Sequence, residues 1–223
     1  MKPIFAIMDI KTKTESLIES LPPHVTLVAV SKTKSVAEIS QAYEAGQRIF
    51  GENKIQEMAA KWETLPRDIS WHMIGHVQTN KVKYMAQFVD LIHGVDSLKL
   101  LKEIQKHALK HRRIIRCLLQ IRIAEEETKF GLPVEKLKEV LETAKTYPNI
   151  EIVGLMGMAT FTENSAQIAA EFNRLKEVYD RYAGQSTSFN TLSMGMSGDY
   201  QIAIACGSTM IRVGSKIFGE RNS

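Results

Sequence analysis

Short apolar runs alternate with stretches of helical periodicity along the chain, and this alternation predicts a protein built from strand–helix units. A first helix is expected over residues 7–20, before any strand. The expected strands are short apolar runs at residues 25–31, 48–50, 71–74, 89–93, 114–121, 150–156, 191–194 and 210–213. The expected helices carry apolar side chains at a spacing of three and four, at residues 36–45, 53–62, 79–87, 97–109, 134–145, 165–182 and 199–205.

Eight such units, with no change of composition and no linker between them, predict one (β/α)8 TIM-type barrel over residues 1–223. An open, doubly wound sheet is the alternative. That fold favours a glycine-rich fingerprint after its first strand, and the sequence has none there. In a barrel the C-terminal ends of all strands share one face, and that face carries the function. The candidate residues are therefore those that follow each strand.

The composition is that of an ordinary globular protein, with 44% hydrophobic and 24% charged residues. The net charge of +4 is too small to indicate a nucleic-acid partner, and no apolar run approaches the ~20 residues of a membrane span. The two cysteines, Cys117 and Cys206, lie in apolar runs and are interpreted as buried thiols in a reducing compartment. The N-terminus lacks the apolar core of a signal peptide. We expect a cytoplasmic monomer.

The first strand ends in an unusual way, because the apolar run Leu27–Val30 is followed directly by Ser31 and Lys32. A lysine at this position could simply reach water, which is the ordinary interpretation. It could also be held half-buried at the functional end of the barrel. A lysine amine whose pKa is lowered by desolvation or by a nearby cation acts as a Schiff-base nucleophile.

Glycines and hydroxyl side chains gather around the last two strands, where barrels often bind phosphate. They include Ser197 after the seventh strand, Ser208 and Thr209 before the eighth, and Gly214 and Ser215 after it. The spacing excludes a P-loop. Glycine lets backbone N–H groups approach phosphate oxygens, although glycine and serine are also common in ordinary turns.

A phosphorylated aldehyde would use both the lysine and a phosphate site, and pyridoxal 5′-phosphate (PLP) is the obvious example. Arg212, near the end of the eighth strand, would then face the pyridine nitrogen. A guanidinium can only donate a hydrogen bond, so it would keep that nitrogen unprotonated and make the cofactor a weaker electron sink. The alternative role for Arg212 is a structural ion pair.

No metal site is expected. His72 and His76 have the four-residue spacing of helical metal ligands, but they flank the end of an expected strand, where residues four apart do not share a helical face.

Seven motifs occur in the order in which one known family carries them: AVSKTK, FGEN, WHMIGHVQTNK, KFGL, GLMGMAT, LSMGMSGD and GSTMIRVG…IFGER. They resemble the pyridoxal phosphate homeostasis proteins, single-barrel relatives of the alanine racemase N-terminal domain, and the resemblance spans about residues 25–221.

The resemblance implies a PLP-bearing barrel with Lys32 as the Schiff-base lysine and Arg212 near the pyridine nitrogen. It implies phosphate contacts by Ser197, Gly214 and Ser215, with Ser208 and Thr209 as further candidates. It also implies that Asn53 of FGEN lies beside the ring, although a helix N-cap role would explain Asn53 equally well.

Racemases of this fold type carry a second, β-rich domain, and the sequence ends directly after the eighth strand. We therefore expect a fold-type III PLP barrel without the C-terminal β domain and without catalytic residues. It would hold PLP in vitamin B6 homeostasis and buffer it or deliver it to PLP-dependent apo-enzymes, with indirect effects on amino- and keto-acid metabolism.

Two alternatives stay open. The first is a PLP-dependent racemase-like enzyme whose second base would be His76, Tyr200 or Lys129. The second is a PLP-independent enzyme of the same fold that acts on a sugar phosphate.

Overall fold

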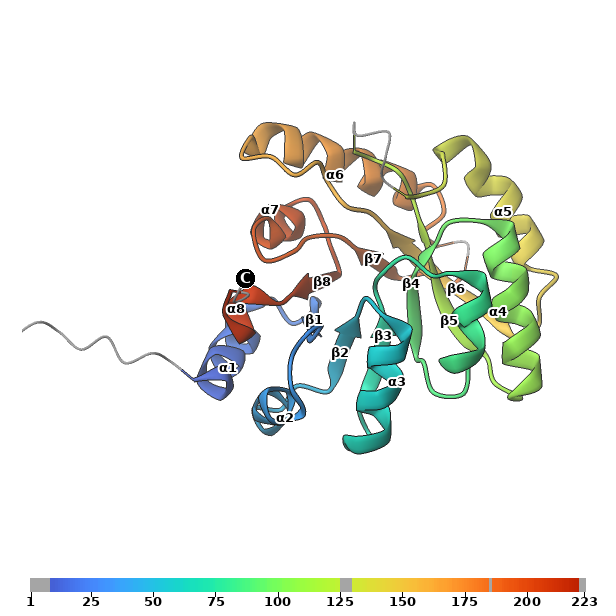
Figure 1. Ribbon diagram of the computed structural model, residues 1–223. Helices are drawn as coiled ribbons and strands as arrows, with labels where there is room; N and C mark the ends of the chain where they lie inside the picture. The colour runs from blue at the N-terminus through green and yellow to red at the C-terminus, as the bar shows by residue number, and fades with distance from the viewer. Residues whose placement is uncertain (1–8, 125–129, 185, 221–223) are drawn as a thin grey trace, which may run out of the picture.

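The computed structural model describes residues 9–124, 130–184 and 186–220, and within these residues eight parallel strands form a closed barrel in sequence order. The expected (β/α)8 barrel is confirmed (Figure 1). The strands are β1 (Thr26–Val30), β2 (Ile49–Glu52), β3 (Ser70–Met73), β4 (Leu91–Val95), β5 (Ile115–Gln120), β6 (Ile150–Met156), β7 (Thr191–Ser193) and β8 (Met210–Val213). Pairing of β1 with β8 closes the barrel, with Val28 opposite Arg212.

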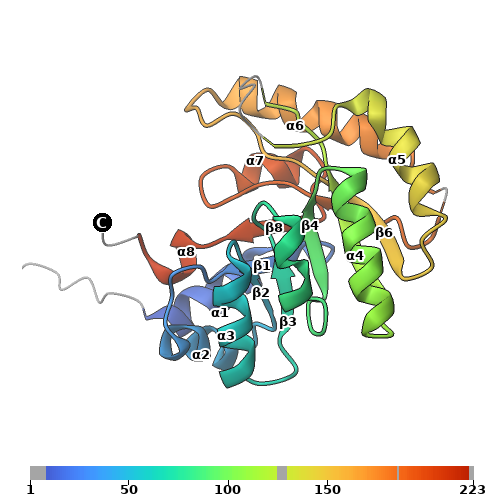
Figure 2. The ribbon, with the colours of Figure 1, turned by 45° about the vertical axis from the view of Figure 1, so that its right-hand side comes forward.

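Helices surround the barrel, as the two ribbon views show (Figures 1 and 2). They are α1 (Ile10–Ser20), α2 (Val36–Glu44), α3 (Ile55–Thr64), α4 (Leu98–Lys110), α5 (Leu137–Ala144), α6 (Ser165–Asp180), α7 (Tyr200–Ala205) and α8 (Ser215–Phe218). Two 3-10 helices, η1 (Thr79–Tyr84) and η2 (Val134–Lys136), complete the set within the described residues. No helix among the described residues has the length and apolar character needed to cross a membrane.

Helix α4 illustrates how the sequence determines these elements. Ser97 caps its N-terminus by accepting a hydrogen bond from the Leu100 N–H, and its buried face contains Leu100, Leu101, Ile104 and Ala108. Basic residues in its last turn lie at the negative end of the helix dipole. The basic cluster at residues 110–113 begins at the end of this helix.

Three expected helices differ from the structure. The helix expected over 134–145 begins as the 3-10 helix η2 and continues as α5. The chain after β2 begins its helix at Ile55 rather than at Asn53, and the N-cap residue is Lys54, which makes no side-chain capping bond. The segment expected to be helical over 79–87 is the short 3-10 helix η1, which packs against α3 and α4. Its buried Val82, with Met85 and Ala86 directly after it, holds a compact turn in place of a regular α-helix.

Helix α1 occupies the position of the last helix in the ring. The helix after β8, α8, spans only Ser215–Phe218, which is too short to cover the gap between β8 and β1. Helix α1 packs against both α2 and α8, and both ribbon views place it there (Figures 1 and 2). Its buried Thr14 and Leu17 face inward. The N-terminal helix thus completes the outer layer.

The core has an outer and an inner layer. The large outer cluster lies between the strands and the helices, and the inner cluster consists of Val28, Leu91, Leu118, Val153, Met156 and Met210. These inner side chains fill the barrel, so it is a packed core and not a pore. Cys117 and Cys206 are both free thiols, the first buried and the second half-buried.

Candidate functional site

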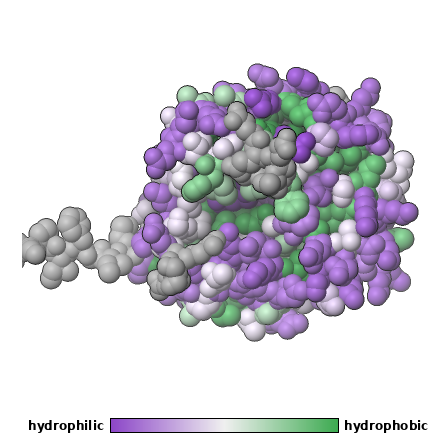
Figure 3. Space-filling model, turned by 45° about the horizontal axis from the view of Figure 1, so that its top comes forward, coloured by the Kyte–Doolittle hydropathy of each residue, from purple (hydrophilic) through white to green (hydrophobic). Residues whose placement is uncertain are grey.

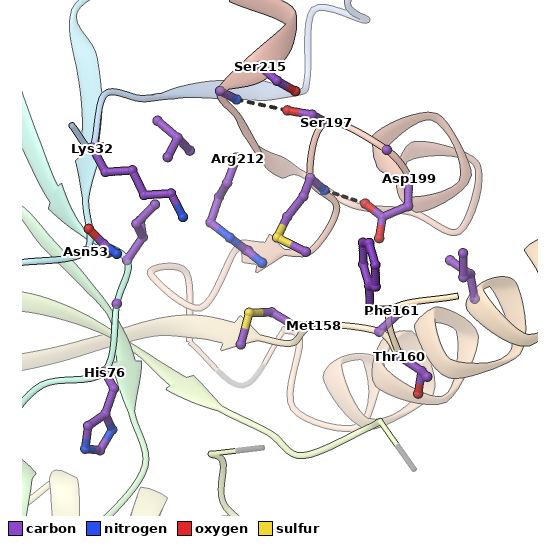
Figure 4. Close-up of a pocket in the computed structure, with 18 of the residues that line it drawn as sticks. Lys32, Asn53, His76, Met158, Thr160, Phe161, Ser197, Asp199, Arg212 and Ser215 are labelled. Atoms are coloured by element: carbon purple, nitrogen blue, oxygen red, sulfur yellow. Dashed lines mark hydrogen bonds between the residues drawn. The ribbon is translucent and has the colours of Figure 1, made fainter. Parts of the chain in front are cut away.

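The end of β1 turns Lys32 into the mouth of the barrel. Side chains alternate along a strand, and Val28 belongs to the inner core cluster, so Val30 and Lys32 point inward while Ser31 points outward. Ser31 is fully buried and Lys32 is half-buried. Figure 4 shows the Lys32 amine extending into a cavity at the C-terminal ends of the strands.

Arg212 on β8 projects into the same cavity and is only 4% exposed. Its Nη1 donates to Ser193 Oγ at 2.6 Å, and its Nη2 donates to the Gly157 carbonyl at 3.2 Å. Burial lowers the pKa of Arg212 to about 10, and the charge of Asp199 opposes that shift. The guanidinium is thus a fixed cation at the inner end of the cavity, held by neutral acceptors.

A chain of polar side chains continues from Arg212 through the barrel interior. Ser193 Oγ lies 3.1 Å from His93 Nδ1, and His93 Nε2 lies 3.0 Å from His72 Nδ1. His72 Nε2 lies 3.7 Å from Asp90 Oδ2, at the N-terminal end of β4. The chain therefore joins the cavity to the opposite end of the barrel.

The two ends of this chain determine its protonation. Burial lowers the pKa of both histidines, that of His93 well below its ordinary value, so each ring carries one proton at neutral pH. Asp90 is ionised: burial raises its pKa, but hydrogen bonds from His72 and Ser70 and the charge of Arg116 outweigh this and leave the pKa well below its ordinary value. A carboxylate only accepts hydrogen bonds, so His72 carries its proton on Nε2, which faces Asp90. Its Nδ1 is then the acceptor for His93, so His93 also carries its proton on Nε2.

The loops after β7 and β8 meet at the other side of the cavity. Ser197 Oγ accepts a hydrogen bond from the Gly214 N–H at 3.1 Å, and Ser215 follows directly (Figure 4). Asp199 holds its loop by accepting from the Met196 N–H at 2.5 Å. Hydroxyl groups and backbone amides are therefore concentrated on this side of the cavity, as expected for an anion site.

Asn53 also lines the cavity, directly after β2. A Cβ atom at Gly75 would lie 2.5 Å from the Asn53 carbonyl oxygen, so glycine is required for the ends of β2 and β3 to approach this closely. The expected capping role of Asn53 is wrong, and its position at the cavity remains.

The cavity has a volume of about 760 Å³. Lys32, Asn53, Ser197, Arg212, Gly214 and Ser215 all line it. Apolar side chains also line it, among them Met158, which packs on the inner core cluster, and the exposed Phe161 and Met196. Figure 3 shows apolar residues gathered at a depression on one face of the molecule, among hydrophilic ones. Six of the eight residues expected at the site are thus brought together.

The other two, Ser208 and Thr209, are not at the cavity, and their expected phosphate role is corrected. Both precede β8, so they lie at its N-terminal end, whereas the cavity is at the C-terminal ends. Ser208 is fully buried and donates to the Met194 carbonyl at 2.8 Å. Thr209 Oγ1 accepts from the Leu192 N–H at 2.8 Å. Both hydroxyls therefore form hydrogen bonds with backbone groups of the β7 segment.

Sequence reasoning missed His93, which together with Ser193 extends the site into the barrel. The available signal was strand alternation, since His93 is two residues after the inward-facing Leu91. Of the proposed second bases, His76 lines the cavity, Tyr200 is not among its lining residues, and Lys129 lies outside the described residues. Within the described part of the chain, no group of three His, Cys, Asp or Glu residues could hold a metal ion.

Comparison with known proteins gives the family. The model of the alanine racemase N-terminal domain matches residues 8–222. The pyridoxal phosphate homeostasis protein of Aquifex aeolicus (strain VF5) is 40% identical over 197 residues, which cover 87% of this chain and 86% of that protein. The protein of the same name from Synechocystis sp. is 41% identical over 208 residues, covering 92% and 95%. The chain belongs to the pyridoxal phosphate homeostasis protein family.

Solved structures agree with this membership. PipY of Synechococcus elongatus PCC7942 is 36% identical, and the alignment covers 95% of this chain and 100% of PipY. The TM-score is 0.89 for PipY without PLP and 0.86 for PipY with PLP bound. Alanine racemase from E. faecalis has a TM-score of 0.75 at 15% identity, with 96% of this chain and 58% of the racemase covered, so it shows the shared fold alone. The family resemblance expected from the motifs is confirmed.

Proposed function

We propose that this chain binds PLP in the cavity as a Schiff base on Lys32 and acts as a non-catalytic carrier in vitamin B6 homeostasis. The observation that carries the proposal is that Lys32 and Arg212, from the ends of β1 and β8, project into one cavity. Membership of a family in which PipY has been solved with PLP bound supports it.

The residues present fit PLP group by group. The Lys32 amine suits the aldehyde, and the buried Arg212 guanidinium suits the pyridine nitrogen, which is an acceptor when unprotonated. The hydroxyls of Ser197 and Ser215 and the backbone at Gly214 suit the phosphate. The volume of about 760 Å³ lies within the ordinary range of small-molecule sites.

Each of these residues has a defined task. When bound, PLP supplies an aldehyde that condenses with a primary amine and a ring that withdraws electrons. Lys32 binds covalently, and Arg212 donates a hydrogen bond and cannot accept a proton from the ring nitrogen at neutral pH. The Ser193–His93–His72 chain holds the guanidinium in place. This arrangement favours retention of the cofactor over carbanion chemistry.

A carrier also needs a recipient for the cofactor. We propose that a cytoplasmic monomer, with one PLP-binding barrel over residues 1–223, passes PLP to PLP-dependent apo-enzymes and so affects amino- and keto-acid metabolism indirectly. Family membership favours this role over the sugar-phosphate alternative. For the racemase-like alternative, His76 lines the cavity, where it lies 3.3 Å from Asp96 and stacks on Phe130, and Tyr200 is not among the lining residues.

Titration of the purified protein with PLP tests the proposal. We expect a Schiff-base absorbance band that borohydride removes, together with no exchange of the α-hydrogen of alanine in deuterium oxide. A protein that takes up no PLP would overturn the binding proposal. Rapid α-hydrogen exchange would overturn the carrier role in favour of the racemase-like alternative.

A further inference from the structure

The backbone at Lys32 adopts a turn that its sequence does not favour. The Lys34 N–H donates to the Ser31 carbonyl at 3.0 Å, which closes a four-residue turn with Lys32 and Thr33 at its centre. Thr33 has a φ of 65°, and among the described residues Arg112 is the only other non-glycine residue with a positive φ. Turns with positive φ at the third position ordinarily carry glycine or asparagine. A β-branched threonine there is strained and persists only if its surroundings hold it.

Two side chains of α3 hold this turn on either side of Lys32. Glu57 Oε1 accepts from the Thr33 N–H at 2.6 Å, and Lys61 Nζ donates to the Ser31 carbonyl at 2.8 Å. Glu57 and Lys61 are one helical turn apart and form an ion pair at 2.7 Å. The backbone groups on both sides of Lys32 are therefore bound by one pair of charged residues.

Glu52 completes this group of charged residues, which we call the α3 clamp: Glu52, Glu57 and Lys61. Glu52 Oε1 accepts from Lys61 Nζ at 2.7 Å and from Ser31 Oγ at 2.6 Å. The Glu52 side chain is fully buried and that of Lys61 is 8% exposed. Burial raises the pKa of Glu52, although its bonds to Lys61 and Ser31 oppose the shift.

The α3 clamp lies outside the cavity. None of its members lines the cavity, because the outward-facing Ser31 side chain meets the clamp while Lys32 points the other way. Burying charged groups is costly even when they are paired, so a purely apolar contact would stabilise the fold at least as well. What the clamp supplies, and an apolar contact cannot, is a donor for the Ser31 carbonyl and an acceptor for the Thr33 N–H.

We propose that Glu57 and Lys61 are positioning residues that hold the strained Ser31–Lys34 turn and thereby orient the Lys32 amine toward its ligand. The proposal rests on the proposed function, since it assigns Lys32 as the Schiff-base lysine. Loss of the clamp lets Thr33 relax to negative φ, which turns Lys32 away from the position in which it meets the aldehyde. The Schiff base then forms more slowly and exchanges faster.

Exchange with hydroxylamine measures this orientation. The hydroxylamine nitrogen forms a C=N bond to the aldehyde carbon of PLP, the C=N bond to Lys32 breaks, and both hydrogens of the incoming amine end on the lysine nitrogen. For PLP-loaded Glu57→Ala we expect exchange about tenfold faster than for the wild type, as the release of one strained residue implies. Glu57→Gln keeps an acceptor oxygen for the Thr33 N–H and should stay close to the wild-type rate.

A distant exposed ion pair provides the control for this exchange experiment. Lys145→Met removes an exposed ion pair with Glu142 on α5, far from the turn in sequence, and should exchange like the wild type. A Glu57→Ala rate within about threefold of the wild type overturns the proposal, since that is less than about 0.7 kcal/mol. If the wild type forms no Schiff base at all, the proposed function fails instead, so the two failures are distinguishable.

A second variant separates orientation of the turn from general loosening. Asparagine tolerates positive φ, so Thr33→Asn should make the turn favourable without the clamp. The double variant Glu57→Ala/Thr33→Asn is expected to return toward the wild-type exchange rate. A double variant that exchanges as fast as Glu57→Ala contradicts the role assigned to backbone strain.

Hydrogen exchange of the ligand-free wild type tests the proposal without any substitution, so it does not depend on whether a variant folds. Thr33 is exposed, so its amide hydrogen should exchange quickly with solvent unless Glu57 binds it. We expect the Thr33 amide to be protected in hydrogen-exchange NMR, in contrast to exposed amides that make no hydrogen bond. An unprotected Thr33 amide overturns the proposal.

Discussion

Replacing Arg212 by methionine separates stability from ligand binding, because the buried guanidinium contacts no carboxylate among the residues that the structure describes. Burial lowers its pKa from the ordinary value of arginine to about 10. A shift of this size corresponds to about 3 kcal/mol against the charged form in the folded state. Arg212 is protonated in both the folded and the unfolded chain at neutral pH, so this cost is fully present there. It is relieved only as the pH rises above about 10, where the folded chain begins to lose the proton.

The hydrogen bonds of Arg212 offset part of this cost. Its bonds to Ser193 Oγ and to the Gly157 carbonyl are worth about 0.5–1.5 kcal/mol each. Arg212→Met should therefore leave the free energy of unfolding of the ligand-free protein between unchanged and about 2 kcal/mol higher. Its PLP retention should fall at the same time, since methionine offers no donor to the pyridine nitrogen.

Urea unfolding of the ligand-free protein and dialysis of the PLP-loaded protein measure the two effects. Lys61→Met is the matched comparison, because it also removes a buried cation but leaves Glu52 buried without its partner. That variant should lose about 3–5 kcal/mol. A loss of more than about 2 kcal/mol in Arg212→Met, or PLP retention equal to that of the wild type, would refute this reasoning.

Three further predictions concern other parts of the site. Lys32→Ala should abolish the Schiff-base absorbance while circular dichroism still reports a folded barrel; retained absorbance would assign the linkage to another lysine. Because the pKa values of His72 and His93 are lowered in the folded state, the unfolded chain takes up protons below pH ~6.5 that the folded chain does not. The free energy of unfolding should therefore fall below that pH, by up to about 1.4 kcal/mol per histidine and pH unit. His93→Gln should make this fall shallower, and an equally steep fall in a urea titration series would contradict the buried neutral pair. Ser197→Ala should weaken PLP retention in equilibrium dialysis whereas Ser208→Ala should not, because only Ser197 lines the cavity; equal losses would contradict the correction made for Ser208.

The barrel and the place of Lys32 could be predicted from the sequence because both depend on local pattern. Apolar runs of strand length recur eight times, and the side-chain alternation of β1, continued past its last residue Val30, puts Lys32 on the inward side. Ser208 and Thr209 show a different lesson. The expected boundaries already put them before the eighth strand, so their position opposed the phosphate role that their hydroxyl groups suggested.

Contacts between distant segments account for what the sequence could not provide. The Asp90–His72–His93–Ser193 chain exists only because β3, β4 and β7 bring single residues together inside a closed barrel. The end of β2 is a second case. The strand continues through Glu52, a residue type usually exposed, because Lys61 from the following helix pairs with it in the buried layer.

The central claim is that Lys32 binds PLP covalently. The most direct measurement is borohydride reduction of the PLP-loaded protein, followed by peptide mass spectrometry. The account predicts one dominant modified peptide, with the reduced pyridoxyl group on Lys32. Modification of a different lysine, or no modified peptide after incubation with PLP, would contradict it.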